Sequence, residues 1–268
     1  MLGWSINLFR IFGIQLAVHV SFLLLLAYFA ITGWLEAGVA GAGWSLLLII
    51  LFFACVVLHE LGHSLTARRY GVRVARILLL PIGGMAEFDR IPRRPSAELL
   101  ITVAGPAVNF VLAAVLLPIV WTDLWSEQAL PEHGLENLLL NLAVANGVMG
   151  LFNLLPVFPM DGGRIFRALL ATKLNYLRAT YWASIVGRIL AAALAALAAF
   201  YYGNYLLAVL FVFIYSAGAA EYRQLLRREQ ETAYWAEWSQ RVASEQARAA
   251  SERGDTPPPP PIIYHGPN

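Results

Sequence analysis

Two histidines and a glutamate stand close together in a strongly apolar stretch of the chain. His59, Glu60 and His63 lie in the segment LLLIILFFACVVLHELGHSL. On an α-helix, residues four apart lie about 40° apart on one face, one turn above the other. Two imidazoles at that spacing can hold one Zn²⁺, and the glutamate between them can reach a metal-bound water. The spacing therefore predicts two metal ligands and a general base for hydrolysis.

The apolar surroundings strengthen this interpretation. A charged side chain inside a membrane helix costs about 2.5–3.5 kcal/mol on insertion scales, so ionisable groups there usually mark function. The alternative is a pair of core histidines that hydrogen-bond to neighbouring helices, with Glu60 neutralised. The same insertion cost makes this alternative the less favoured one.

A catalytic zinc ion usually has three protein ligands and one open position for water. Asp161 is the candidate for the third ligand, in the segment NLLPVFPMDGG. Pro156 and Pro159 end the preceding helix, and Gly162 and Gly163 permit a tight backbone path. The broken backbone can turn the carboxylate inward. The alternative is an aspartate that only caps the helix that follows.

The elements that position these residues are membrane helices. The chain is 59% hydrophobic and 13% charged, against about 45–50% and about 25% for a soluble domain. A spanning helix needs about 20 mostly apolar residues. We therefore predict an all-α polytopic membrane protein with about six transmembrane helices, over residues 17–34, 44–66, 97–118, 136–155, 180–201 and 204–221.

Charge in the connections predicts the orientation of these helices. Lys and Arg concentrate in residues 68–94, 164–178 and 223–228 and are absent from 35–43, 119–135 and 202–203. Positive charge stays on the cytoplasmic side, so both termini are expected in the cytoplasm. The second and fourth helices then both run inward, which brings His63 and Asp161 to similar depths.

Residues 71–90 do not resemble an ordinary loop. β-Branched and apolar residues flank the turn Pro81-Ile82-Gly83-Gly84, which predicts a small membrane-associated β-hairpin. Residues 6–15 are expected to add a strand before the first helix. An exposed strand edge in 72–88 would accept an extended substrate by β-augmentation, a hypothesis that proline at positions 74–80 would test.

Two regions are expected along the chain. Residues 1–221 form the membrane-embedded domain, and residues 222–268 form a cytoplasmic tail. The tail is polar with mixed charges and is expected to be helical, up to a disordered end at Pro257–Pro261.

Taken together, HELGH at 59–63, GPAVN at 105–109 and NLLPVFPMDGG at 153–163 closely resemble the motifs of the site-2 protease family (peptidase family M50). The resemblance implies an intramembrane zinc metalloprotease that cuts peptide bonds in or near transmembrane segments, as in regulated intramembrane proteolysis. It implies one Zn²⁺ per chain, held by His59, His63 and Asp161, with Glu60 activating the zinc-bound water. Many members carry PDZ or CBS domains; we expect neither here.

The resemblance also suggests residues that contact the substrate or the oxyanion. Asn109 and Asn153 match asparagines of the family's motifs, and Gly83 and Gly84 match the glycine turn of its β-hairpin. For each asparagine, an interhelical hydrogen bond, worth about 0.6 kcal/mol on average, is the alternative role.

Partners follow from the same resemblance. The expected substrate is a single-span membrane protein, within the lipid bilayer of a bacterial inner or plasma membrane, and homo-oligomerisation is left open. A net charge of +2 gives no reason to expect a nucleic-acid partner. Two competing functions use the same residues: a metal transporter or sensor, and an inactive homologue that binds membrane segments. Transport would favour several polar sites along a path, and an intact Glu60 argues against inactivity.

Overall fold

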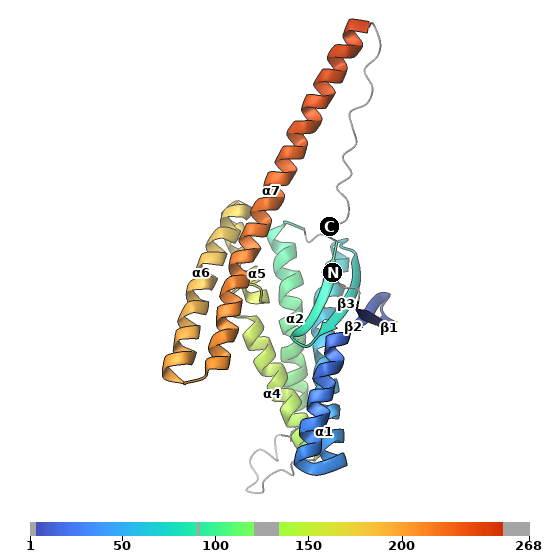
Figure 1. The fold of residues 1–268 in the computed structure, drawn as a ribbon, viewed down its shortest axis with the longest axis vertical. Coiled ribbons are helices and arrows are strands. Elements are labelled where there is room, and N and C mark those ends of the chain that lie inside the picture. The colour runs from blue at the N-terminus through green and yellow to red at the C-terminus, as the bar shows by residue number, and fades with distance from the viewer. Residues whose placement is uncertain (1–3, 90–91, 121–133, 254–268) are drawn as a thin grey trace.

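A computed structural model describes residues 4–89, 92–120 and 134–253. The described chain is mostly helical, with a small sheet near its N-terminus (Figure 1). In chain order the elements are β1 (Ser5–Ile11), β2 (Ile14–His19), α1 (Val20–Arg69), β3 (Val74–Leu80), β4 (Gly83–Phe88), α2 (Pro95–Leu116), the 3₁₀ turn η1 (Leu117–Val120), α4 (Leu135–Asn153), α5 (Asp161–Ala171), α6 (Tyr176–Ala196), the π turn η2 (Leu197–Tyr201) and α7 (Tyr205–Arg253).

Five of the described helices are long and apolar enough to span a membrane: α1, α2, α4, α6 and α7. Helix α1 corresponds to two of the six predicted segments. A break in its backbone at Ala37 and Gly38 separates them. Gly38 has a φ of 62°, which favours glycine. The two arms then pack against each other, with the rings of Phe22 and Phe53 only 4.6 Å apart. The six-crossing count stays a prediction.

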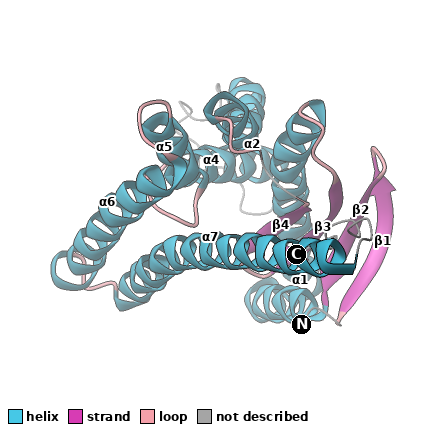
Figure 2. Cartoon of the chain, turned by 90° about the horizontal axis from the view of Figure 1, so that it is seen from above, coloured by secondary structure: helices cyan, strands magenta, loops and turns pink. Residues whose placement is uncertain are grey.

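The strands form one four-stranded sheet in the order β1-β2-β3-β4, rather than an isolated hairpin. The predicted hairpin corresponds to β3 and β4, which are antiparallel and turn at residues 81–82. The predicted N-terminal strand extends into a second one, β2, which pairs in parallel with β3. Figure 2 shows the sheet on one side of the bundle, next to α1.

The first membrane helix begins a few residues later than the predicted start at residue 17. Residues 14–19 are strand, and α1 begins at Val20, after His19 accepts a hydrogen bond from the Ser21 N–H. Four of these strand residues are buried and apolar. Hydropathy cannot separate such a buried strand from the start of a helix. The strand packs through Leu16 and Val18 against the cluster that also holds Phe53 and Leu61 of α1.

The last helix continues far beyond the apolar segment. α7 runs from Tyr205 to Arg253 and projects beyond the other helices in Figure 1. The expected helix in the tail is therefore an extension of the last candidate span. The proline-rich end lies outside the described residues, and the division into two domains stays a prediction.

Candidate metal centre

The C-terminal half of α1 carries both histidines. His59 and His63 each expose only 5% of their surface. Their Nε2 atoms lie 3.1 Å apart, as expected for neighbours one helical turn apart on one face. The sequence-based expectation that the two rings converge on one point is therefore met.

Asp161 reaches the same point from a distant part of the chain. α4 ends at Asn153, and the carboxylate belongs to the first residue of α5. Its Oδ2 lies 3.4 Å from Nε2 of His59 and 3.2 Å from Nε2 of His63. Gly162 makes this path possible, since a Cβ there would overlap backbone atoms of residues 154 and 155.

The remaining contacts of the two rings leave both Nε2 atoms free for a cation. Nδ1 of His63 donates to the Ile101 carbonyl at 2.8 Å, and Nδ1 of His59 faces Oδ1 of Asn109 at 2.5 Å. A neutral imidazole protonated at Nδ1 carries its lone pair on Nε2. Two lone pairs and one carboxylate oxygen therefore face one another.

The electrostatics of Asp161 fit a cation at this point. Its Oδ2 is buried and has no hydrogen-bond partner in the described structure. Burial alone would raise the pKa of the Asp161 carboxyl, but positive charge on the two imidazoles lowers it further than burial raises it, so positive charge at this point keeps the carboxyl ionised. The three ligand atoms lie within 4.8 Å of one another. Two histidine nitrogens and a carboxylate oxygen are a donor set that zinc accepts.

Helix α2 forms the wall behind the histidines. At Gly105 a Cβ would overlap the His63 imidazole and lie 2.8 Å from Cε1 of His59. Across the same contact, a Cβ on Gly62 would lie 2.7 Å from the Ala104 carbonyl oxygen. The close approach of α1 and α2 therefore depends on two glycines. The packing role of Gly105, the first residue of the GPAVN segment, was not predicted from the sequence.

Glu60 lies between the metal centre and the sheet. It interacts electrostatically with His63, His59 and Asp161, and its carboxylate accepts a hydrogen bond from the Ala86 backbone. A Cβ on Gly84 would lie only 2.6 Å from Cγ of Glu60. The start of β4 therefore passes directly over Glu60, a contact that the glycine makes possible.

The other predicted residues lie at different distances from this centre. Asn109 is fully buried behind His59, and its Nδ2 donates to Oδ1 of Asn146 at 2.8 Å. Asn146, which the sequence interpretation missed, donates in turn to the Leu142 carbonyl. Its position inside the apolar segment 136–155 was the signal that could have identified it. Asn153 is the half-buried last residue of α4, and Gly83 opens β4 with a φ of 134°.

Comparisons with known proteins agree with this geometry. The sequence model described as Peptidase family M50 matches residues 47–127 and 118–194. A zinc metalloprotease of Methanocaldococcus jannaschii is 43% identical over 190 residues, which are 71% of this chain and 52% of that protein. Stage IV sporulation protein FB of Bacillus subtilis is 29% identical over 168 residues, 62% of this chain and 51% of that one. The chain spans about half the length of the curated relatives it matches.

A solved structure has a similar fold. The site-2 protease from Methanocaldococcus jannaschii superimposes with a TM-score of 0.58 at 39% identity, covering 82% of this chain and 95% of that one. The family match includes both histidines and Asp161, the three residues that the fold brings together. This chain belongs to peptidase family M50.

Proposed function

We propose that this chain is an intramembrane zinc metalloendopeptidase that hydrolyses peptide bonds in or near the transmembrane segments of membrane proteins. One observation carries the proposal. Two imidazole nitrogens and a carboxylate oxygen converge at the C-terminal half of a candidate span, with a second carboxylate, Glu60, beside them. That combination supplies three metal ligands and a general base close to one another.

The residues of the site have separate tasks in this reaction. A zinc ion held there would lower the pKa of a bound water toward about 7 and would polarise the scissile carbonyl. Glu60 accepts the proton of the attacking water and passes it to the leaving amine. Asp161, His59 and His63 would hold the ion. No covalent bond to the chain is needed.

We assign Asn109 to the positioning of His59 instead of to the substrate. Its Oδ1 faces the ring nitrogen, its Nδ2 is used by Asn146, and its exposed fraction is zero. Such a partner fixes the tautomer and the orientation of a metal-binding histidine. Asn153, which is only half-buried, remains the candidate for a contact with the oxyanion or the substrate.

The outer edge of β4 is the proposed docking edge for the substrate. A transmembrane substrate is helical and must be extended before its peptide bonds become accessible. Within the described sheet β4 is an edge strand, and the Ala86 backbone on that edge reaches Glu60. A substrate strand added there lies next to the metal centre. β3 is interior, so proline at 74–80 would break pairing with β2 or β4 and does not test this hypothesis.

Cysteine cross-linking tests the docking edge. Met85 of β4 is partly exposed, and the single native cysteine, Cys55, is buried. The experiment uses Met85→Cys in the Glu60→Gln background and a series of single-span substrates, each with one cysteine at a different position. Disulfides should form at every second substrate position, because successive side chains of a strand point to opposite faces. Leu35→Cys, highly exposed near the break in α1, is the matched control. Cross-links of helical period, or equal cross-linking of the control, would refute β-augmentation.

The function itself is tested with purified protein in detergent and single-span substrates. We expect cleavage that a zinc chelator abolishes and added zinc restores. Transport is the competing function, but among the described residues only one cluster has the composition of a metal site. Zinc flux into vesicles without any cleavage would favour transport and contradict our proposal. The expected location, a bacterial inner or plasma membrane with both termini in the cytoplasm, is part of the same proposal.

A further inference from the structure

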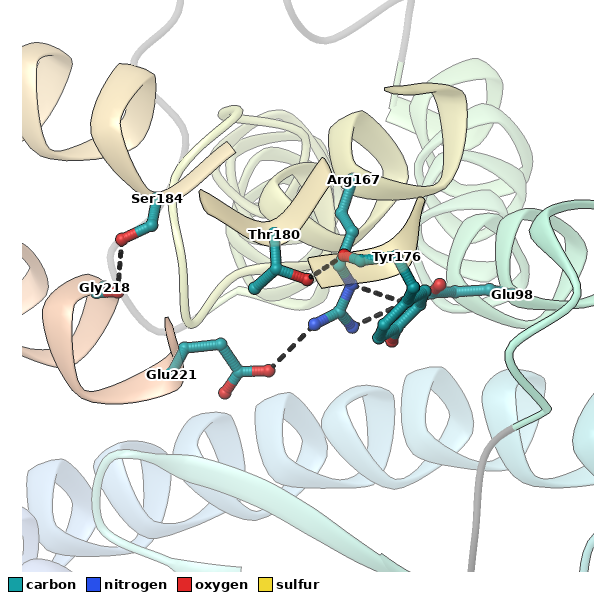
Figure 3. Close-up of polar contacts among 7 residues, drawn as sticks. All are labelled: Glu98, Arg167, Tyr176, Thr180, Ser184, Gly218 and Glu221. Atoms are coloured by element: carbon teal, nitrogen blue, oxygen red, sulfur yellow. Dashed lines mark hydrogen bonds and ion pairs between the residues drawn. The ribbon is translucent and has the colours of Figure 1, made fainter. Parts of the chain in front are cut away.

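A second charged cluster lies on the same short helix as Asp161. Arg167 exposes only 5% of its surface, and its partner Glu98 on α2 is fully buried. Nε and Nη2 of Arg167 donate to Oε1 of Glu98 at 2.9 and 2.5 Å. Its third nitrogen, Nη1, donates to Glu221 of α7 at 3.0 Å (Figure 3). One guanidinium therefore connects three helices.

Two aromatic rings enclose the same guanidinium. Its carbon lies 5.1 Å from the centroid of the Phe158 ring and 5.0 Å from that of Tyr176. The Tyr176 hydroxyl donates to Oε1 of Glu98 at 3.4 Å, and Figure 3 draws both side chains beside Arg167. Arginine suits such a site, because its planar fork binds carboxylates and stacks on rings at once.

The partners of Arg167 are parts of the structure that holds the metal ligands. Phe158 precedes Asp161 by three residues in the segment that presents its carboxylate. Glu98 lies on α2, three residues before Ile101, whose carbonyl accepts the Nδ1 proton of His63. The same helix carries Gly105, which packs against both imidazoles. Arg167 thus fastens the helix of one ligand to the helix that orients the other two.

Stability alone does not explain this cluster. Taking two charges out of water costs free energy that their attraction often fails to return, and apolar residues of similar volume can replace such a pair without loss. What apolar packing lacks is direction: it does not specify how α5 is rotated and shifted against α2. The ion pair does so, through two hydrogen bonds to one oxygen.

We infer that Arg167 is a positioning residue that sets Asp161 against His59 and His63 through Glu98 and Phe158. The inference rests on the proposed function of the three ligands. Loss of the ion pair shifts α5 against α2, and the carboxylate oxygen leaves the position where it meets both Nε2 atoms. Residues that orient metal ligands typically change metal affinity or activity by about 10–100-fold when mutated.

Two variants separate positioning from folding. Arg167→Met with Glu98→Leu removes both charges, so no unpaired charge stays buried. Arg167→Lys keeps the charge but loses the fork. In detergent we expect thermal midpoints near that of the unaltered chain. Zinc affinity, measured by competition with a chelator, and kcat should each fall by about 10–100-fold in the double variant. KM should stay unchanged, and Arg167→Lys should lie between the double variant and the unaltered chain.

Glu221→Gln is the control, because it removes only the charge of the more exposed partner of Arg167. It should retain zinc affinity and kcat. The inference is overturned if the folded double variant, or folded Arg167→Lys, binds zinc like the unaltered chain. If the double variant does not fold, the result for Arg167→Lys decides. An unaltered chain that neither binds zinc nor cleaves refutes the proposed function instead.

Discussion

Replacing Glu60 with glutamine should abolish peptide cleavage while the metal stays bound. Glutamine has nearly the same shape, but its amide cannot take a proton from water. Loss of a general base lowers the rate by about 10²–10⁴-fold. The zinc content should not fall, because the cluster of ligand atoms consists of His59, His63 and Asp161. Cleavage rate and zinc content are measured on the same preparation.

The matched control for this variant is Glu237→Gln. Glu237 lies on the projecting end of α7 and pairs with Arg241 at 3.4 Å on the exposed surface of that helix. It should cleave at nearly the rate of the unaltered chain, because an exposed pair contributes little. If Glu60→Gln retains most of the activity, then Glu60 is not the base and the proposed mechanism is wrong.

Replacing Gly105 with alanine should destroy the metal centre. The added methyl group would overlap the His63 imidazole and press on that of His59. Both rings are held from behind by Ile101 and Asn109, so they cannot yield without losing these hydrogen bonds. We expect zinc affinity to fall by about 100-fold or more, the upper end of what altered ligand orientation causes. Chelator competition measures the loss.

Gly147→Ala is the control for that variant. Gly147 lies within α4, and a Cβ there would meet nothing within 4 Å. Alanine in a helix is more favourable than glycine by about 1 kcal/mol, so this variant should bind zinc normally and unfold at the same or a higher temperature. Normal zinc affinity in Gly105→Ala would mean that α2 does not confine the two histidines.

Local signals were enough to predict part of this site. The two histidines and Glu60 share one helical turn, so their spacing alone places them together. Asp161 required one further step: a third ligand was missing, and the prolines before it predicted the end of α4. The helix does end at Asn153, before the carboxylate. Hydropathy located the helices because it is also a local signal: each candidate span is a continuous stretch of mostly apolar residues.

Features that depend on contacts between distant segments were not predictable in this way. The strand at 14–19 pairs in parallel with residues 76–79, and only this pairing separates it from the helix that follows. Gly105 is needed for the metal centre because α1 packs closely against it. The residues next to Gly105 in the sequence do not indicate this contact. In the sequence, Arg167 is one of several basic residues in the predicted connection 164–178. The structure buries it against Glu98, which lies 69 positions away.

The proposed function requires that His59, His63 and Asp161 hold a single zinc ion. Anomalous X-ray scattering from a crystal of an active preparation, recorded on both sides of the zinc absorption edge, tests it most directly. We expect one zinc peak per chain, between Nε2 of His59, Nε2 of His63 and Oδ2 of Asp161, and we expect it to be lost in Asp161→Ala. A zinc peak at any other position, or a peak between the two histidines that persists in Asp161→Ala, would contradict it.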